Sequence, residues 1–301
     1  MKLPDSIRKK IIIGTWSWSG QYKSVSDKTI EDVFNNCLNN KFLEFDTSPT
    51  YLKAEKILSE FKRENNNILI NTKCGWDQNM KKNFNEKNLI YGVERALDLF
   101  KNINVMQLHN PRDEIKNWDK VINVLKKFKK KGYINSIGIS LPRNSYFPKK
   151  IMNKFDFIQD EFNLLRVEPY YKMNNFKKIF AARSPFANGI LTTNFSSLSA
   201  FSKNDHRHSW LSGARLKTIS QQKKILESLT NLKIETLATN FVLSFPFVDK
   251  VIFGIRTKKH LLDLVKNLTN LKKINKKLIS VILDLHQNNY YYTKSKNKYN
   301  N

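Results

Sequence analysis

The fold expected for this chain is decided by four short apolar stretches that each close on or next to a polar residue: EFDTSPTY (44–51), LINTKC (69–74), MQLHN (106–110) and IGISL (137–141). Such short apolar runs are typical of strands buried on both faces of a parallel sheet. The polar residues are Asp46, Lys73, His109 and Ser140, with Tyr51 shortly after Asp46. Neighbouring strands lie about 4.8 Å apart, so these side chains are expected to converge at one edge of the sheet.

Amphipathic helical segments alternate with strand-like segments along the chain. The segment 26–40 has apolar residues at helical spacing with Ser26 or Asp27 as N-cap, and the segment 118–132 has the same spacing and ends at Gly132. Further helices are expected over 54–64, 93–103, 220–231, 235–245, 258–268 and 271–286. Strands are expected over 11–18, 42–48, 68–74, 104–110, 134–140, 155–163, 178–184 and 249–255.

This alternation predicts parallel strands joined by right-handed crossovers. About eight repeats fit a closed (β/α)8 TIM barrel, an α/β fold of one domain spanning residues 1–301. An open doubly wound sheet is disfavoured, because no G-x-G-x-x-G follows the first strand and no phosphate-binding P-loop motif occurs. The polar segment 194–215 is expected to be a functional loop over the barrel rim, and 287–301 a mobile tail.

Composition narrows the location and the partners. The two cysteines, Cys37 and Cys74, argue against a disulfide framework, and Cys74 is expected to be buried and inert. No segment has the apolar core of a signal peptide or the roughly 20 apolar residues of a membrane span. A cytoplasmic protein without a membrane partner is therefore expected.

The charge is strongly basic, with 53 Lys and Arg against 26 Asp and Glu, a formal net charge of +27. Such a charge is compatible with binding nucleic acid or an acidic membrane surface. The lysines are, however, spread over many expected helices, and abundant Lys and Asn also follow from an A/T-rich coding sequence. We expect no specific nucleic-acid partner.

The residues at the strand ends suit the reduction of a carbonyl group, which requires a hydride at carbon and a proton at oxygen. The phenol of Tyr51 is a weak acid, and the ammonium of Lys73 next to it would lower its pKa. A carboxylate such as Asp46 keeps a buried lysine charged. The imidazole of His109 can orient the substrate oxygen through a hydrogen bond.

The sequence resembles aldo-keto reductases over nearly its whole length. The matching stretches are GTWSW (14–18), FDTSPTYLKAEKILSEF (45–61), NTKCGW (71–76), VMQLHNP (105–111), INSIGIS (134–140), FIQDEFNLLR (157–166), ARSPFANGILT (182–192) and VIFGIRTKKHLLDL (251–264). Each stretch alone is a weak signal, but their order and their spacing on a barrel make the resemblance specific.

The resemblance implies an NADPH-dependent oxidoreductase that reduces a small aldehyde or ketone, with sugar-like carbonyls among the candidates. In this interpretation Tyr51 is the general acid, Lys73 lowers its pKa, Asp46 supports Lys73, and His109 orients the carbonyl. The alternative is a nucleotide-binding regulatory or scaffold subunit of the same family without physiological turnover. The substrate, the reaction direction and the oligomeric state are left open.

The resemblance also implies a binding site for NADPH (NADP+) along the barrel mouth. The residues expected to contact the cofactor are Thr15, Trp16, Ser140, Gln159, Arg183, Ser184, Pro185, Leu191, Gly254, Arg256, Thr257, His260 and Asp263. The residues expected to contact substrate are Trp16, Trp18, Trp76 and His109. His206 and His208 lack further ligands at metal-binding spacing, so they are expected to be surface residues and no metal is expected.

The chain departs from the family pattern near the expected nicotinamide site. Leu52 stands where a glycine usually follows the catalytic tyrosine, Leu141 replaces an asparagine, and Arg183 replaces an aromatic residue that many members stack on nicotinamide. The four expected catalytic residues are all present.

Overall fold

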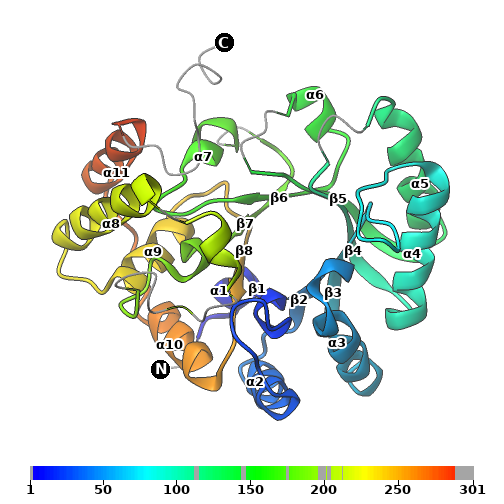
Figure 1. Ribbon diagram of the computed structural model, residues 1–301, viewed down its shortest axis with the longest axis horizontal. Helices are drawn as coiled ribbons and strands as arrows, with labels where there is room; N and C mark the ends of the chain where they lie inside the picture. The colour runs from blue at the N-terminus through cyan, green and yellow to red at the C-terminus, as the bar shows by residue number, and fades with distance from the viewer. Residues whose placement is uncertain are drawn as a thin grey trace.

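The computed structural model describes residues 3–111, 115–143, 147–173, 176–195, 201, 205–211 and 213–288. Eight parallel strands form a closed barrel in which each strand pairs with the next and β8 pairs with β1 (Figure 1). The strands are β1 (Ile11–Gly14), β2 (Glu44–Asp46), β3 (Leu69–Cys74), β4 (Ile103–His109), β5 (Ile134–Ser140), β6 (Phe157–Glu161), β7 (Ile179–Arg183) and β8 (Lys250–Gly254). The predicted (β/α)8 barrel is confirmed.

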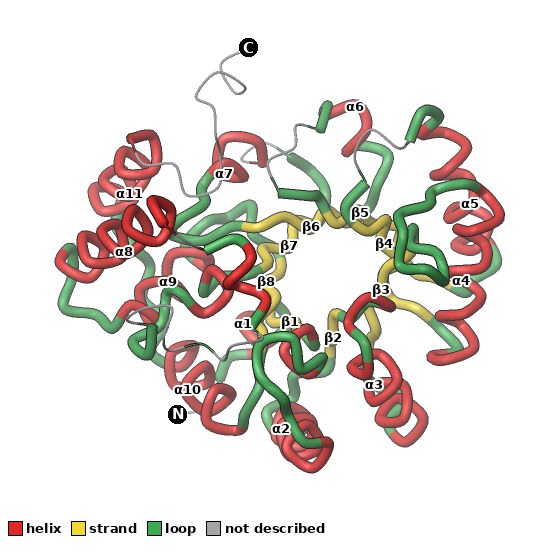
Figure 2. The backbone as a smooth tube through the Cα atoms, in the orientation of Figure 1, coloured by secondary structure: helices red, strands yellow, loops and turns green. Residues whose placement is uncertain are grey.

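Helices surround the ring of strands (Figure 2). The longer ones are α2 (Asp27–Asn39), α3 (Lys53–Glu64), α4 (Glu86–Phe100), α5 (Trp118–Lys130), α8 (Gly213–Ser228), α9 (Ile234–Leu243), α10 (Lys258–Thr269) and α11 (Lys276–Asn288). Short helical turns are α1 (Asp5–Arg8), η1 (Trp16–Trp18), η2 (Pro49–Tyr51), α6 (Lys149–Met152), α7 (Glu168–Met173), η3 (Ala187–Gly189) and η5 (His206–Ser209).

Side-chain caps explain where several helices begin. Ser26 Oγ accepts a hydrogen bond from the Thr29 amide at 3.2 Å and starts α2, so Ser26, and not Asp27, is the cap of the two that were predicted. Asn85 accepts one from the Asn88 amide at 2.8 Å, so α4 begins at Glu86 and not at residue 93 as predicted. The prediction placed the start too late because it followed the apolar spacing alone.

Other differences lie around the loops. The strand predicted over 11–18 ends at Gly14 and is followed by η1, and α8 begins inside the segment 194–215 that was predicted as a loop. Within that segment, residues 196–200, 202–204 and 212 lie outside the described residues, as do residues 289–301 of the predicted tail. The crossovers that carry α6 and α7 contain helices of only four and six residues, too short for an apolar period to predict.

The register of the strands places the polar residues on one face. Asp46 pairs with Asn71, and Lys73 lies two residues beyond Asn71 on β3. Lys73 pairs with Gln107, and His109 lies two residues beyond Gln107 on β4. Because residues two apart in a strand point to the same face, Asp46, Lys73 and His109 all point into the C-terminal mouth of the barrel.

Two expectations from composition concern the cysteines and membrane-spanning helices. Cys37 and Cys74 are buried free thiols, and burial raises the pKa of each to about 12, which agrees with an inert role for Cys74. Among the helices of the described residues, none has both the length and the apolar character to cross a membrane.

Candidate active site

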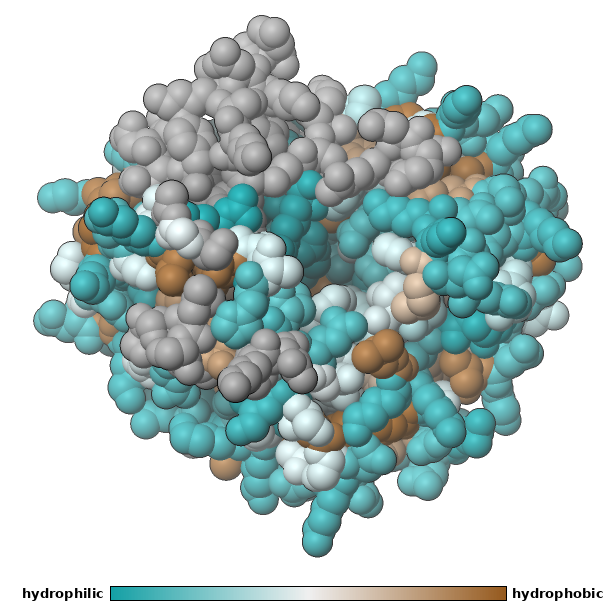
Figure 3. Space-filling model, viewed as in Figure 1, coloured by the Kyte–Doolittle hydropathy of each residue, from teal (hydrophilic) through white to brown (hydrophobic). Residues whose placement is uncertain are grey.

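A cavity of about 850 Å³ opens at the C-terminal ends of the strands. Its mouth is the hollow near the middle of the face in Figure 3, within a mostly hydrophilic surface. The predicted site residues that line it are Trp16, Asp46, Tyr51, Trp76, His109, Ser140, Gln159, Arg183, Ser184, Pro185, Gly254, Arg256, His260 and Asp263. The structure therefore brings residues from all parts of the chain to one cavity, as catalytic sites of such barrels require.

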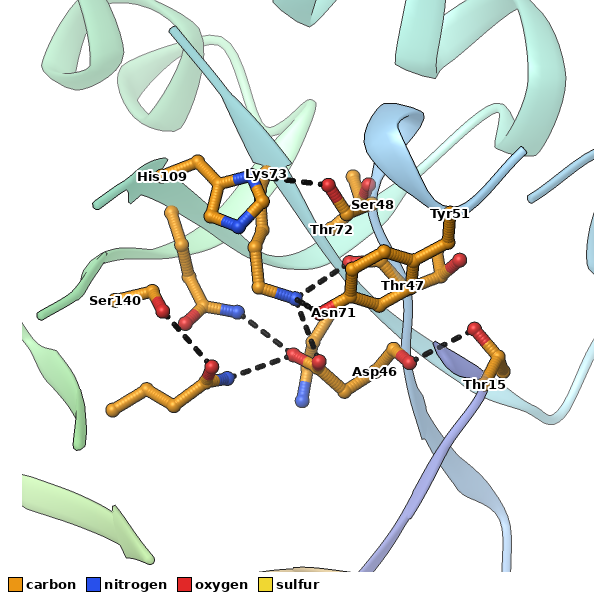
Figure 4. Close-up of polar contacts among 12 residues, drawn as sticks. Thr15, Asp46, Thr47, Ser48, Tyr51, Asn71, Thr72, Lys73, His109 and Ser140 are labelled. Atoms are coloured by element: carbon orange, nitrogen blue, oxygen red, sulfur yellow. Dashed lines mark hydrogen bonds and ion pairs between the residues drawn. The ribbon is translucent and has the colours of Figure 1, made fainter. Parts of the chain in front are cut away.

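Lys73 lies beneath the cavity floor and joins three groups (Figure 4). Its Nζ lies 2.6 Å from Asp46 Oδ1, 2.7 Å from the carbonyl oxygen of Thr47 and 3.2 Å from the hydroxyl of Tyr51. The side chains of Lys73 and Asp46 are only 1% and 4% exposed. These three acceptors match the three donors of an ammonium group, so Lys73 is held in place as a cation.

The second carboxylate oxygen of Asp46 is also bound. It accepts hydrogen bonds from Gln107 Nε2 at 3.0 Å and from Gln159 Nε2 at 2.9 Å, and Gln159 Oε1 accepts one from Ser140 at 3.0 Å. Gln107 was not predicted as a site residue. Its position two residues before His109 on the same strand was the available signal, because alternate residues share a face.

Tyr51 is positioned by the turn that follows β2. Pro49 occupies the first position of η2, where its restricted backbone suits a helical start. Leu52, directly after Tyr51, has a φ of 51° and is 57% exposed. This is left-handed backbone that favours glycine and costs a branched residue of order 1–3 kcal/mol. The turn therefore holds Leu52 in a backbone conformation that a glycine would adopt with less strain.

The ionisation states of Tyr51 and Lys73 follow from their burial and from the charges beside them. Burial raises the pKa of Tyr51 above its ordinary value, although Lys73 acts in the opposite direction, as predicted. Burial alone would lower the pKa of Lys73, but Asp46 and Tyr51 outweigh it and the pKa is raised. The predicted lowering of the Tyr51 pKa by Lys73 is therefore present, but burial of the hydroxyl outweighs it. At neutral pH Tyr51 carries its proton and Lys73 its charge.

His109 is buried beside this pair. Burial, together with the nearby cations Lys73 and Arg183, lowers the pKa of His109 well below 6.5. The imidazole is thus neutral at neutral pH and has a single N–H group. Its Nδ1 lies 3.1 Å from the hydroxyl oxygen of Ser48.

The lowered pKa of His109 predicts a pH-dependent stability. Just below pH 6.5 the unfolded chain binds a proton at this residue and the folded protein does not, so stability falls as the pH drops, by up to about 1.4 kcal/mol per pH unit. Between pH 7.5 and pH 5.5 the free energy of unfolding should therefore fall less in His109→Phe than in the wild type, and urea unfolding at both pH values measures this. His206 and His260, whose pKa values are also lowered by burial, remain in both proteins. Equal losses would contradict the buried, neutral state of His109.

Aromatic rings form the walls around Tyr51 and His109. The ring of Trp16 meets that of Tyr51 edge-on at a centroid distance of 4.9 Å, and the ring of Trp76 lies 5.8 Å from that of His109. Trp18 does not line the cavity, so its prediction as a substrate contact is wrong. It is fully buried, and its indole N–H donates to the carbonyl oxygen of Ile255 at 2.8 Å, because η1 turns this side chain away from the mouth.

Three of the residues predicted to contact the cofactor do not line the cavity. Thr15 is buried and donates its hydroxyl proton to the carbonyl oxygen of Asp46 at 3.1 Å, and Leu191 is fully buried in the core. Thr257 accepts a hydrogen bond from the His260 amide at 3.3 Å as the N-cap of α10. Their side chains are used within the protein, so a side-chain contact with a ligand in the cavity is not supported.

Arg183 lies in the cavity wall at the end of β7. It donates to the carbonyl oxygen of Leu141 at 2.9 Å and lies 3.5 Å from a carboxylate oxygen of buried Glu161. Glu161 also binds Arg143 at 2.7 Å. The guanidinium is thus held against the wall by Glu161 on β6 and by the residue that follows β5.

The segment around η5 supplies residues that the sequence did not reveal. His206, predicted to be a surface residue, lines the cavity with its ring 5.7 Å from that of Trp16 and 4.8 Å from that of Tyr22. Arg207 donates to the carbonyl oxygen of Asn188 at 2.8 Å and lies over the ring of Tyr22. These contacts bring the segment after β7 against the loop after β1.

Comparison with known proteins agrees with this architecture. A family model described as "Aldo/keto reductase family" matches residues 10–282. The glycerol dehydrogenase AKR11B4 from Gluconobacter oxydans superposes with a TM-score of 0.76 at 18% identity, and the aldo-keto reductase AKR11C1 from Bacillus halodurans (holo form) with 0.73 at 16%. Each comparison covers 95% of this chain and 94% of the other. No curated protein sequence matched the chain. At these identities the two structures support the fold alone.

Proposed function

The chain belongs to the aldo-keto reductase family of NAD(P)H-dependent oxidoreductases, and on this premise we propose that it reduces a small aldehyde or ketone, with sugar-like carbonyls among the candidates, using NADPH and Tyr51 as proton donor. The observation that supports this role most directly is the contact of 3.2 Å between Lys73 Nζ and the Tyr51 hydroxyl. A protonated phenol in contact with a buried cation is suited to releasing a proton when negative charge develops on a nearby oxygen.

The proposed reaction divides the work among the four residues. When bound, NADPH supplies the hydride that adds to the carbonyl carbon. The hydroxyl of Tyr51 gives its proton to the carbonyl oxygen, and Lys73 stabilises the phenolate that remains. His109 donates a hydrogen bond to the same oxygen and orients it, and Asp46 keeps Lys73 charged. The alcohol product contains the hydride and the proton, so charge and atoms balance.

Residues of the cavity fit the carboxamide of a nicotinamide. Hydrogen bonds to Asp46 and from Ser140 use one amide hydrogen and one carbonyl lone pair of Gln159. A glutamine amide has two hydrogens and two lone pairs, which leaves one of each for a carboxamide. Gln159 lines the cavity beside Arg183, and both would contact this end of the cofactor.

The cavity wall toward β7 and β8 fits the phosphates. Ser184, Ala187 and Asn188 have positive φ angles, which bend the segment after β7 around this side of the cavity. Arg256 and His260 line the cavity at the N-terminus of α10, where the helix dipole favours an anion. We assign this wall to the pyrophosphate and the 2′-phosphate of NADPH.

Arg256→Gln tests the assignment of the 2′-phosphate. We expect the dissociation constant of NADPH to rise about tenfold, the effect of losing one charged hydrogen bond, and that of NADH to change little. Fluorescence titration measures both. Lys266→Gln, which removes the same charge from the exposed last turn of α10, is the matched control. A parallel rise for both cofactors, or the same rise in Lys266→Gln, would place the 2′-phosphate elsewhere.

The proposed activity is tested by turnover with a panel of small aldehydes, ketones and sugars. Absorbance at 340 nm, followed with NADPH and with NADH in parallel, reports consumption of the cofactor. Turnover of at least one carbonyl, faster with NADPH, is expected. Tight binding of NADPH without turnover of any member would favour a nucleotide-binding regulatory subunit instead.

We also propose that the protein is cytoplasmic, with no nucleic-acid or membrane partner.

A further inference from the structure

Ser48 contacts the catalytic histidine directly. Its Oγ lies 3.1 Å from Nδ1 of His109, across the gap between the end of β2 and the end of β4 (Figure 4). Ser48 is fully buried and His109 is 6% exposed. Among the described residues, Ser48 is the hydrogen-bond partner that the structure gives to the His109 ring. Because both residues are buried, bulk water does not compete for this hydrogen bond.

The hydroxyl of Ser48 is itself held in one place. Its oxygen accepts the backbone N–H of Thr50 at 3.2 Å and lies 3.0 Å from Thr50 Oγ1. The next residue, Pro49, restricts the backbone of this turn. Ser48 therefore presents its hydroxyl to His109 from a rigid position, which is what fixing a ring orientation requires.

Two arrangements of protons satisfy these contacts. In the first, Ser48 donates to Nδ1 and Thr50 Oγ1 donates to Ser48, so the imidazole proton is on Nε2. In the second, Nδ1–H donates to Ser48, Ser48 donates to Thr50 Oγ1, and Nε2 has a lone pair. In both, the oxygen of Ser48 also accepts the amide of Thr50, so heavy-atom distances alone do not separate them.

The position of Nε2 shows why the choice matters. The second ring nitrogen of His109 points away from Ser48, toward the space between Lys73, Tyr51 and Ser140 (Figure 4). A carbonyl oxygen in this space is an acceptor, so only an N–H at Nε2 can bond to it. A neutral imidazole has one proton, and the atom that receives it decides whether His109 can assist the reaction.

We propose that Ser48 is a positioning residue that donates its hydroxyl proton to Nδ1 of His109 and thereby keeps the ring proton on Nε2, where it faces the substrate carbonyl. This inference rests on the proposed carbonyl reduction for its catalytic meaning, but the proton arrangement itself is independent of turnover. Ser48 acts through His109 and needs no contact with substrate.

Nitrogen-15 NMR of the histidine rings near pH 7.5 tests the proton arrangement without any substrate. The signals of His109 are those absent from the spectrum of His109→Phe. We expect a protonated Nε2 and an unprotonated Nδ1 in the wild type, and a mixture of both tautomers in Ser48→Ala. A protonated Nδ1 in the wild type would overturn the proposal, and this holds even if Ser48→Ala fails to fold.

Kinetics test whether the tautomer has a catalytic effect. Ser48→Ala is expected to lower kcat about tenfold, the effect of losing one neutral hydrogen bond, with little change in NADPH affinity. Ser26→Ala is the matched control, because Ser26 also accepts an amide hydrogen, has a threonine hydroxyl as partner (Thr29, at 2.8 Å), and caps a helix away from the cavity. Its kcat should equal that of the wild type.

A double-mutant cycle separates an effect through His109 from an effect through the turn that holds Tyr51. If Ser48 acts through His109, Ser48→Ala causes no further loss of kcat in the His109→Phe background. A full tenfold loss in that background would show that Ser48 merely supports the turn, and would overturn the proposal. If the protein reduces no carbonyl at all, the proposed function fails, whereas the NMR result still decides the proton arrangement.

Discussion

Tyr51→Phe is expected to lower kcat by about 10²- to 10⁴-fold, the range that a positioned general acid contributes. The substitution removes one oxygen atom, which is the atom bound to Lys73 at 3.2 Å. The ring remains to pack against Trp16, so the cavity keeps its shape. NADPH affinity, measured by fluorescence titration, should stay close to that of the wild type.

The matched control for this variant is Tyr170→Phe. Tyr170 is a half-buried tyrosine that packs against Phe245 and does not line the cavity. It loses the same atom, so kcat should be unchanged. An unchanged kcat in Tyr51→Phe would rule out Tyr51 as the proton donor and the mechanism built on it.

Lys73→Met is expected to remove turnover and to lower the free energy of unfolding by about 3–5 kcal/mol. Asp46 would be left as an unpaired carboxylate at 4% exposure, with its remaining hydrogen bonds coming from neutral amides. Desolvating an unpaired charge is costly, and that cost is the source of the lost stability. Urea unfolding measures the stability, and the 340 nm assay measures turnover.

Two further variants test whether burial causes the loss of stability expected for Lys73→Met. Lys127→Met breaks a pair with Glu86 whose side chains are 71% and 55% exposed, and should cost less than about 1 kcal/mol. The double variant Asp46→Asn with Lys73→Met removes both charges and should regain most of the stability, but no activity. If Lys73→Met were as stable as Lys127→Met, the buried ion pair described above would be wrong.

Much of the candidate site was predictable because it follows from strand periodicity. Asp46, Lys73 and His109 each lie at the end of an apolar run, and the alternation of side chains in strands places them on one face. The parallel barrel then follows from the repeated strand and helix segments. These are local properties that short stretches of sequence contain.

Residues that act through distant partners were not predictable in this way. Ser48 and His109 are 61 positions apart, and Gln159 and Asp46 are 113 apart. Neither pairing has a local signal, because the shear and closure of the barrel decide which side chains meet. The same holds for Arg207, which reaches Asn188 from a segment with no decodable pattern.

The two tryptophans after β1 show the same contrast between what the local sequence predicts and what the tertiary structure decides. By sequence, Trp16 and Trp18 were both predicted to contact substrate. The short helix η1 turns Trp16 toward Tyr51 and buries Trp18 against Phe45 and Phe61. The sequence by itself determined the barrel and the polar residues at its strand ends, because both depend on local periodicity. Only the tertiary structure decided the hydrogen bonds of Asp46 and His109, because these depend on how distant strands close around one cavity.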